Sequence, residues 1–388
     1  MPLPFGLLVM FIKYVLIVQN KEIKMYCIYN VQCGGILVLD LFAKREDTLF
    51  EVLKRESRPI VVYGMGNGAD KILDICESKE IKIQDIFASD EFVRGHSFRG
   101  YKVKKYSEVT KLYPDAVILL AFAVFKEDLM TKIENIAREH TLLVPDVPLF
   151  GTGLFDYDFL TANIDNIEKA YDLFADSKSK QVFLDVINFR LTGNPQILRR
   201  CESDRTEVFE SIIKLGSNEH YIDLGAYDGD TVKEFLANTG GQYASITAFE
   251  PDRKNMKKLT KAFGEYSNCR LLPYASWSED CEMLFSGTGG RMSCFDKNGD
   301  STPARSVDSL CTKATYIKMD VEGAEYETLR GCRSIISDCK PALAVSAYHR
   351  AGDIFTLPLL LQKMNPDYKI FLRHHTYLPS WETNVYAV

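Results

Sequence analysis

The stretch that most constrains the fold of this chain is residues 221–231, where an apolar strand runs into a glycine turn and a helix. The strand begins at Tyr221 and breaks at Gly225, and a second glycine, Gly229, precedes apolar residues at helical spacing. A strand, a glycine turn and a helix form a nucleotide-sized cradle, because glycine permits close backbone approach and the helix start offers unpaired N–H groups. The stretch therefore predicts an α/β fold with a ligand at the turn.

Two acids in this stretch, Asp223 and Asp228, distinguish it from a phosphate-binding loop. A carboxylate beside the turn repels pyrophosphate but accepts hydrogen bonds from hydroxyl and ammonium groups. A nucleoside that carries an amino acid group therefore fits better than a dinucleotide, and S-adenosylmethionine is such a ligand. The alternative is an ordinary strand, turn and helix capped by acids, since a short motif is only a hypothesis.

The next predicted strand, residues 245–249, ends in an acid, Glu250. An acid at the end of the second strand, about 20 residues after the glycine turn, is suited to binding both hydroxyls of a ribose. Pro251 and Asp252 then start a helix. The two strands and the helix between them form one βαβ unit with an acid at each strand end.

Length and composition exclude several classes of protein. The chain has 388 residues, which favours two or three domains, and its net charge of −6 gives no basic surface for nucleic acid. Its 10 cysteines form no CxxC pair, which argues against a zinc site and a disulfide scaffold. We therefore expect a protein of the reducing cytoplasm, with no nucleic-acid partner.

The N-terminal residues 3–18 are strongly apolar, with Lys13 in their midst. They are short for a membrane span and have no evident cleavage site, so no stable membrane insertion is expected. Two interpretations compete: a weakly membrane-associating segment, or a translated extension upstream of the true start, with Met25 as an alternative start. We favour the extension.

Strands and helices alternate in two separate series, which predicts two open, mainly parallel sheets. Residues between the series have helical spacing, and Gly193 and Pro195 end the last of these helices. The predicted fold class is α/β, with two Rossmann-like domains joined by a helical connector that is either a spacer or a lid. The predicted divisions are an N-terminal extension and helix (1–57), a Rossmann-like domain of the nucleotide-binding type (58–150), the connector (151–215) and a second α/β domain (216–388).

The first series carries its own glycine-rich turn, with Gly64, Gly66 and Gly68 after a strand and Asp90 after the next one. These glycines either bind the phosphate of a nucleotide, with Asp90 near a ribose, or form only a tight turn. A lone GxGxG does not decide between the two.

A second chemical centre follows the strand 315–319, which ends at Asp320. Ligands of open parallel sheets bind beyond the carboxyl ends of the strands, so Asp320 is predicted to face the same crevice as Asp223. Glu322 and Glu325 follow in the first turn of a helix, where acids also serve as capping charges.

With these motifs, residues 220–388 resemble the FkbM-type S-adenosylmethionine-dependent methyltransferases. The matching segments are residues 221–231, 248–252, 305–310 and 317–325, in the family's order. The resemblance implies a seven-stranded class I methyltransferase fold with an antiparallel last strand, the cofactor S-adenosylmethionine, and a sugar hydroxyl as a frequent acceptor. Residues 58–150 resemble, more loosely, the Rossmann-like domain fused to some of these enzymes.

The resemblance also implies roles for single residues: Asp223, Gly225 and Gly229 hold the methionine end of the cofactor, and Glu250 its ribose. Two further cofactor-binding candidates, Tyr227 and Pro251, lie in the same motifs, and a third, Ala275, follows the predicted strand 270–274.

Transfer to oxygen needs an in-line approach and a way to remove the hydroxyl proton. His349, after the strand 342–347, is the first candidate base and would act as a neutral imidazole, while Asp320 either orients the acceptor or keeps the imidazole in the right tautomer. His374 and His375, after the strand 368–372, are the second candidates. No metal is expected; the alternative is a metal held by Asp320, Glu322 and a histidine.

The predicted function is O-methylation of a sugar or glycan-linked hydroxyl, with a small-molecule or glycan acceptor as partner. One alternative is a non-catalytic protein that senses nucleotides, and another is a methyltransferase that acts on a nitrogen or carboxyl acceptor. The sequence leaves the acceptor and the oligomeric state open.

Overall fold

The computed structural model describes residues 13–19, 22–28, 38–93, 95, 97–150, 153–286, 294–295 and 300–388. They belong to two compact units, Met1–Leu41 and Phe42–Val388. In the first unit, β1 (Lys13–Gln19) and β2 (Glu22–Ile28) pair antiparallel, and a 3-10 turn spans Val38–Leu41. Of the apolar stretch 3–18, residues 3–12 lie outside the described residues. No helix in the described part of the chain is long and apolar enough to cross a membrane.

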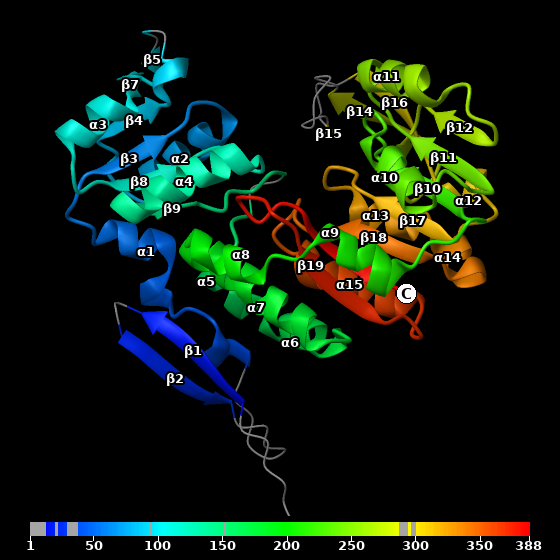
Figure 1. The fold of residues 1–388 in the computed structure, drawn as a ribbon, viewed down its shortest axis with the longest axis horizontal. Helices are drawn as coiled ribbons and strands as arrows, with labels where there is room; N and C mark the ends of the chain where they lie inside the picture. The colour runs from blue at the N-terminus through cyan, green and yellow to red at the C-terminus, as the bar shows by residue number, and fades with distance from the viewer. Residues whose placement is uncertain are drawn as a thin grey trace, which may run out of the picture. The chain divides into compact units, whose positions relative to one another are not determined.

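The second unit begins with a 3-10 turn, η2 (Arg45–Asp47), and α1 (Leu49–Lys54), followed by a five-stranded parallel sheet (Figure 1). Its strand order is β7-β4-β3-β8-β9. The strands are β3 (Ile60–Tyr63), β4 (Asp85–Ala88), β7 (Lys104–Lys105), β8 (Val117–Leu120) and β9 (Thr141–Leu143). The helices are α2 (Asn67–Ser78), α3 (Tyr106–Leu112) and α4 (Glu127–Glu139), and η3 (Asp90–Phe92), β5 (Ser97–Phe98) and β6 (Tyr101–Lys102) form a small excursion.

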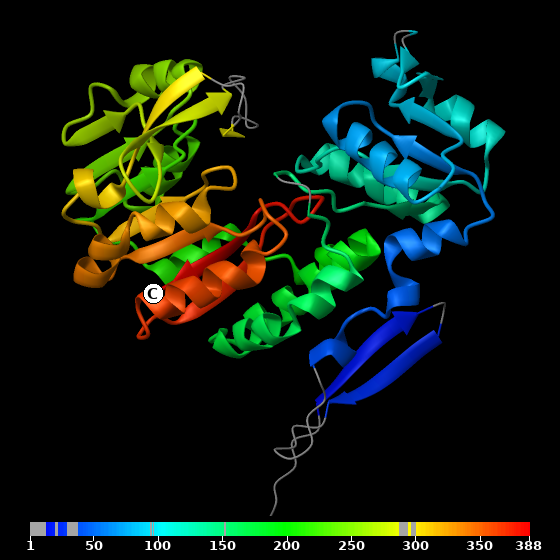
Figure 2. The same cartoon turned by 180° about the vertical axis from the view of Figure 1, so that it is seen from behind.

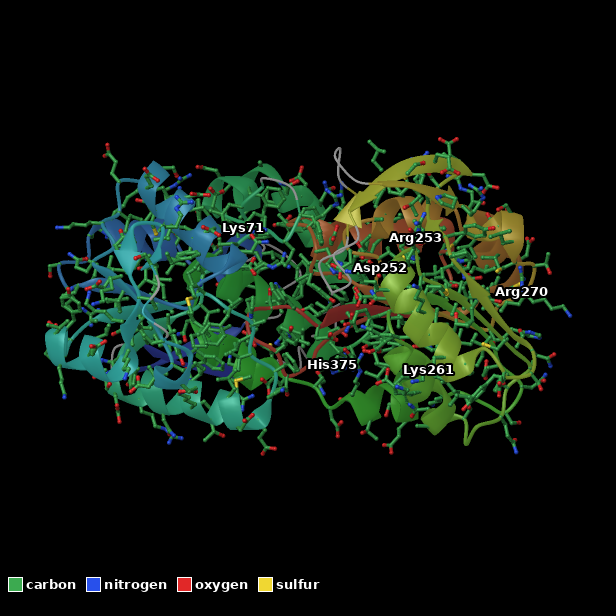
Figure 3. All side chains as sticks on the ribbon, turned by 90° about the horizontal axis from the view of Figure 1, so that it is seen from above. Lys71, Asp252, Arg253, Lys261, Arg270 and His375 are labelled. Atoms are coloured by element: carbon green, nitrogen blue, oxygen red, sulfur yellow. The ribbon has the colours of Figure 1, made fainter. Side chains whose placement is uncertain are left out.

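In the glycine turn after β3, close packing explains why residue 68 is a glycine. A Cβ on Gly68 would lie 2.4 Å from the carbonyl oxygen of Ala121, so only glycine lets the start of α2 approach the end of β8. Lys71, one turn further along α2, donates to the carbonyls of Pro148 and Leu149 (Figure 3). These contacts tie the turn into the fold, which supports the tight-turn interpretation for Gly68.

The connector consists of helices that pack against an edge strand of the second sheet. They are α5 (Tyr157–Ala162), α6 (Ile164–Leu173), α7 (Ser177–Thr192), α8 (Pro195–Cys201), α9 (Arg205–Glu207) and a π-turn, η4 (Val208–Ile213). α7 ends at Gly193 with a left-handed φ of 67°, as the sequence predicts. The hydroxyl of Ser179 accepts from the backbone N–H of Leu372. The connector is therefore joined to the second domain rather than a free spacer.

The second sheet has seven strands in the order β12-β11-β10-β17-β18-β20-β19 (Figures 1 and 2). Its strands are β10 (His220–Leu224), β11 (Ser245–Phe249), β12 (Cys269–Leu272), β17 (Tyr316–Met319), β18 (Ala342–Ser346), β19 (Ile370–His374) and β20 (Thr383–Ala387). β20 runs antiparallel to both of its neighbours, and the other neighbouring pairs are parallel. The predicted seven-stranded fold with an antiparallel last strand is confirmed.

Helices cover both faces of this sheet (Figures 1 and 2). They are α10 (Asp230–Asn238), α11 (Arg253–Phe263), α12 (Val307–Leu310), α13 (Glu325–Arg330), α14 (Arg333–Cys339) and α15 (Asp353–Met364). Asp252 caps α11 by accepting from the N–H groups of Lys254 and Asn255 (Figure 3). Phe235 of α10 stacks on Tyr221 of β10 with ring centroids 4.3 Å apart, which anchors the helix to the sheet.

The segment between β12 and β17 forms a smaller four-stranded sheet. Its strands are β13 (Ala275–Ser276), β14 (Cys281–Ser286), β15 (Cys294–Phe295) and β16 (Asp300–Arg305), in the order β13-β16-β14-β15. β14 and β16 pair antiparallel, so this insertion is built around a hairpin-like pair of strands.

The carboxyl ends of β10 and β17 approach each other closely at Gly225. This residue has a φ of 83°, and a Cβ added to it would lie 1.9 Å from the carbonyl oxygen of Asp320. A backbone oxygen cannot move away as a flexible side chain can. Any other residue at this position must therefore separate the two strand ends.

We predict that Gly225→Ala lowers the free energy of unfolding by at least about 2 kcal/mol, because it adds a backbone clash to an unfavourable φ. Gly240→Ala is the matched control, since Gly240 has a φ of 61° but no atom within 4 Å of an added Cβ. Urea denaturation of both variants separates the clash from the dihedral strain. Equal destabilisation of the two would contradict the clash at Gly225.

Candidate active site

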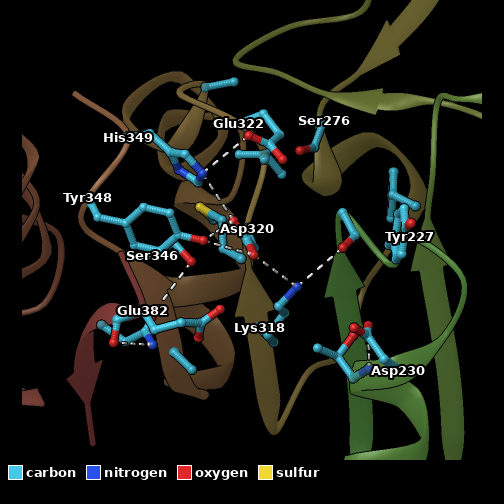
Figure 4. A pocket seen from close by; sticks show the side chains of 18 of the residues that line it. Tyr227, Asp230, Ser276, Lys318, Asp320, Glu322, Ser346, Tyr348, His349 and Glu382 are labelled. Carbon is cyan, nitrogen blue, oxygen red and sulfur yellow. Dashed lines mark hydrogen bonds and ion pairs between the residues drawn. The ribbon is translucent and has the colours of Figure 1, made fainter. Parts of the chain in front are cut away.

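A cavity of about 260 Å³ opens at the carboxyl ends of the central strands of the second sheet (Figure 4). This is the edge at which ligands of open parallel sheets bind. Of the site residues predicted from sequence, those that line the cavity are Gly225, Tyr227, Glu250, Pro251, Ala275, Asp320 and His349.

Glu250 is 5% exposed and its carboxylate is fixed by the backbone. Oε2 accepts from the N–H of Tyr227 at 2.8 Å, and Oε1 accepts from the N–H of Asp252 at 2.9 Å. Each oxygen keeps a lone pair for a ligand hydroxyl. Burial raises the pKa of Glu250 to about 7, although the two N–H groups favour the ionised form.

Tyr227 takes a left-handed φ of 50° in the turn, which aims its N–H at Glu250. The ammonium of Lys258 lies over the Tyr227 ring, 5.2 Å from its centroid, in a cation–π contact. The turn thus joins the end of β10 to the acid that follows β11.

Two of the predicted cofactor residues, Asp223 and Gly229, do not line the cavity. Asp223 is fully buried and accepts from the hydroxyl of Thr231 at 2.6 Å, while its Oδ1 has no hydrogen-bond partner. A Cβ on Gly229 would lie 2.3 Å from the Phe263 ring, so this glycine lets α10 and α11 pack together. Both residues shape the turn from behind the cavity wall.

Lys318 links the two acids from its position in the central strand β17. Its Nζ donates to the carbonyl of Gly225 at 3.2 Å and lies 3.7 Å from Asp223 Oδ1 and 3.9 Å from Asp320 Oδ2. Burial works against its charge, but the two carboxylates outweigh it and raise the pKa of Lys318. Burial still raises the pKa of Asp223, with Lys318 opposing the shift.

Across the cavity, three carboxylates surround the imidazole of His349, and Figure 4 shows two of them, those of Asp320 and Glu322. Nδ1 lies 2.8 Å from Glu325 Oε1, and Nε2 lies 3.4 Å from both Asp320 Oδ1 and Glu322 Oε2. Burial alone lowers the pKa of this imidazole, but the carboxylates, Glu325 first, raise the pKa of His349 well above its usual range. Burial raises the pKa of Asp320, but Lys318 and His349 lower it to a net value below the ordinary one.

The raised pKa of His349 favours a ring with a proton on both nitrogens, which has no lone pair to accept another. This direction argues against the expectation of a neutral His349 that acts as base near pH 7. Its partnership with Asp320, in contrast, is present as a 3.4 Å ion pair.

His374 and His375 are both buried, and neither of them lines the cavity. His374 lies within β19 rather than after it, and its Nδ1 contacts the hydroxyl of Thr383 at 3.0 Å. His375 (Figure 3) contacts the carbonyl of Ser203 and the hydroxyl of Tyr386 at 2.9 and 2.8 Å. Burial lowers the pKa of His374 to about 3 and that of His375 to about 4, so both are neutral packing groups.

The sequence did not reveal the other wall of the cavity, which is aromatic and acidic. It includes Tyr348, Tyr377, Trp381, Glu382, Tyr386 and, from the connector, Arg205 and Phe209. Lys318 carried a usable signal, since a lysine inside an apolar strand requires charged partners. The residues from the connector carried none, because their approach depends on tertiary packing.

Residues 223–379 match the family model described as the Methyltransferase FkbM domain. A crystal structure of methyltransferase FkbM from Methylobacillus flagellatus KT is similar with a TM-score of 0.70 at 23% identity, covering 91% of this chain and 96% of that one. That similarity supports the fold class predicted from sequence.

An rRNA methylase from Streptococcus thermophilus is similar only at a TM-score of 0.31, with 15% identity over 47% of this chain and 92% of that one. This lower similarity supports no functional inference. No curated protein matches the chain.

We predict that Lys318→Met lowers the free energy of unfolding by about 3 kcal/mol, because it leaves the buried carboxylate of Asp223 without a cation. Adding Asp223→Asn should restore part of the loss, as expected for coupled neighbours. Lys340→Met is the control, since Lys340 pairs with Asp367 on the surface. Urea denaturation of the cycle tests the coupling, and strictly additive effects of the two substitutions would exclude it.

Proposed function

We propose that this chain, whose residues 223–379 form a methyltransferase domain of the FkbM family, transfers a methyl group from S-adenosylmethionine to a hydroxyl of a sugar or glycan. The observation that carries the proposal is Glu250. Its carboxylate is held by two backbone N–H groups on the cavity wall, with a lone pair on each oxygen free for a pair of ribose hydroxyls.

The residues of the cavity fit this cofactor better than a dinucleotide. Glu250 and Asp230 line the side of the cavity nearest the glycine turn, where a pyrophosphate would meet repulsion. Gly225, Tyr227, Pro251 and Ala275 would complete the cofactor side. When bound, S-adenosylmethionine supplies a methyl group attached to a sulfonium.

The acceptor side suits a neutral molecule with several hydroxyls. Tyr348, Tyr377 and Trp381 offer ring faces, and the carboxylates of Asp320, Glu322 and Glu382 offer hydrogen-bond acceptors. Such a wall would repel a carboxylate acceptor. We therefore favour oxygen in a hydroxyl over oxygen in a carboxyl group.

Asp320 is the residue that we assign to the acceptor hydroxyl. Tyr348 donates to both of its oxygens at 3.3 Å, which holds the carboxylate in place at the cavity. Asp320 would accept the hydrogen bond of the hydroxyl and take its proton as that oxygen gains the methyl group. His349 would position Asp320, because its ring faces carboxylates on both sides.

A nitrogen acceptor is the second candidate, since the same carboxylates attract an amine in its ammonium form. A panel of sugars, glycans and amines, assayed for transfer of a labelled methyl group, discriminates between the two. Labelled amines without labelled sugars would overturn the proposed acceptor class. A nucleotide sensor without chemistry would label neither.

We predict that Glu250→Gln weakens binding of S-adenosylhomocysteine at pH 8 by about 1–3 kcal/mol, the size of charge-assisted hydrogen bonds to hydroxyls. Asp228→Asn is the matched control, because Asp228 lies in the same turn but does not line the cavity. Titration calorimetry measures both variants. Unchanged affinity in a folded Glu250→Gln protein would remove this residue from the ribose site.

The raised pKa of Glu250 predicts a pH dependence for the same ligand. The ionised carboxylate binds hydroxyls, and its pKa is about 7. The affinity for S-adenosylhomocysteine should therefore be constant well above pH 7 and should fall below pH 7, with a slope that approaches tenfold per pH unit. Calorimetry between pH 5.5 and about 8.5 should show this step in the wild type and not in Glu250→Gln. The same step in both proteins would assign it to another group.

A further inference from the structure

The cluster around His349 has the arrangement of an imidazole ligand with its supporting carboxylate. Glu325 Oε1 lies 2.8 Å from Nδ1 and is itself held by the N–H groups of Val321 and Gly323 at 3.0 and 3.4 Å. A carboxylate behind one ring nitrogen fixes the orientation of the ring and directs the other nitrogen outward. Here that other nitrogen, Nε2, points toward Asp320 and Glu322 (Figure 4).

The spacing around Nε2 is that of ligands rather than of hydrogen-bond partners. Both carboxylate oxygens lie 3.4 Å from Nε2, beyond the usual range for an N–H···O bond. Two ligand atoms at about 2.1 Å from one ion in tetrahedral geometry lie about 3.4 Å apart. An ion beside Nε2 would therefore meet either carboxylate oxygen at the spacing that each of the two pairs already has.

The buried groups of the cluster also lack aligned partners. His349 is 2% exposed and Glu325 is 1% exposed, yet neither Nδ1 of the histidine nor Oε2 of the glutamate has an aligned hydrogen bond. One ligand atom each from Asp320, Glu325 and His349 can be chosen so that all lie within 4.8 Å of one another. Glu322 is held at a left-handed φ of 55°, an uncommon conformation outside glycine.

We propose that His349 Nε2, Asp320 and Glu322 bind a divalent transition-metal ion, with Glu325 as the carboxylate that orients His349. The ion would take the place of the Nε2 proton and compensate the negative charge of both carboxylates. One nitrogen with two carboxylate oxygens suits Mn²⁺ or Zn²⁺ better than Ca²⁺, which prefers oxygen ligands alone. This reverses the expectation from sequence that no metal is bound.

Binding of the ion does not depend on methyl transfer; only its use rests on the proposed function. All three ligand residues line the cavity on the acceptor side. An ion there would bind the acceptor oxygen directly, as a Lewis acid, and would orient it in the cavity. The same carboxylates would then serve the acceptor through the ion.

The test uses Mn²⁺ as the probe, because it has little affinity for thiols and the described cysteines are free. The full chain, treated with a chelator and dialysed, is titrated with Mn²⁺ and the free ion is followed by electron paramagnetic resonance. We expect one bound ion per chain, with a nitrogen coupling in the spectrum of the bound ion. His349→Ala should remove that coupling and weaken binding at least tenfold, and Glu325→Gln should weaken it about 10–100-fold.

Glu327→Gln is the matched control, since Glu327 lies on the same helix but pairs with Arg330 on the surface. Thermal unfolding of each variant shows that it is folded. Equal Mn²⁺ binding by the wild type and His349→Ala, or a bound ion without nitrogen coupling, would overturn the site. S-adenosylhomocysteine binding is measured separately, so metal binding without cofactor binding would refute the proposed function and leave the metal site standing.

Discussion

The close approach of two strand ends, at Gly225 and Asp320, is the constraint on which the site depends. Only a residue without a side chain allows the carbonyl of Asp320 to lie where the Gly225 Cβ would be. The approach lets Lys318 bind the Gly225 carbonyl while it lies between two carboxylates. Backbone packing and charge compensation are thus parts of one arrangement, and neither would persist without the other.

Charge in the cavity is divided into two regions by Lys318. On the cofactor side, Asp223 is compensated by Lys318 and Thr231, so its burial serves the turn rather than a ligand. On the acceptor side, the acids gather around His349, which supplies one positive charge for several negative ones. Because an uncompensated buried charge is costly, the excess of acids around His349 leaves capacity for a further cation there.

The sequence was a good guide to the sheet and a partial guide to the site. Alternating apolar strands and helices predicted a second open, mainly parallel sheet, since a buried parallel strand leaves a local pattern, and the family resemblance implied its seven strands. The motif around Glu250 predicted a residue on the cavity wall, whereas Gly229, in the glycine turn of residues 221–231, serves helix packing. A glycine indicates only that a side chain would not fit at that position. The sequence does not say whether a ligand or another side chain, such as an aromatic ring, fills the adjacent space.

The charge state of His349 could not be predicted for a different reason. A histidine after a strand has an ordinary pKa until its neighbours are known, and Glu322 and Glu325 come from the turn and the helix start that follow a different strand, β17. The aromatic wall depends in the same way on contacts distant in sequence: Val124 pairs with Leu378, and Phe125 stacks on Tyr377 at 5.4 Å. The loop that carries Tyr377 and Trp381 to the cavity is therefore braced by the first α/β series, so the acceptor wall is a product of both halves of the chain.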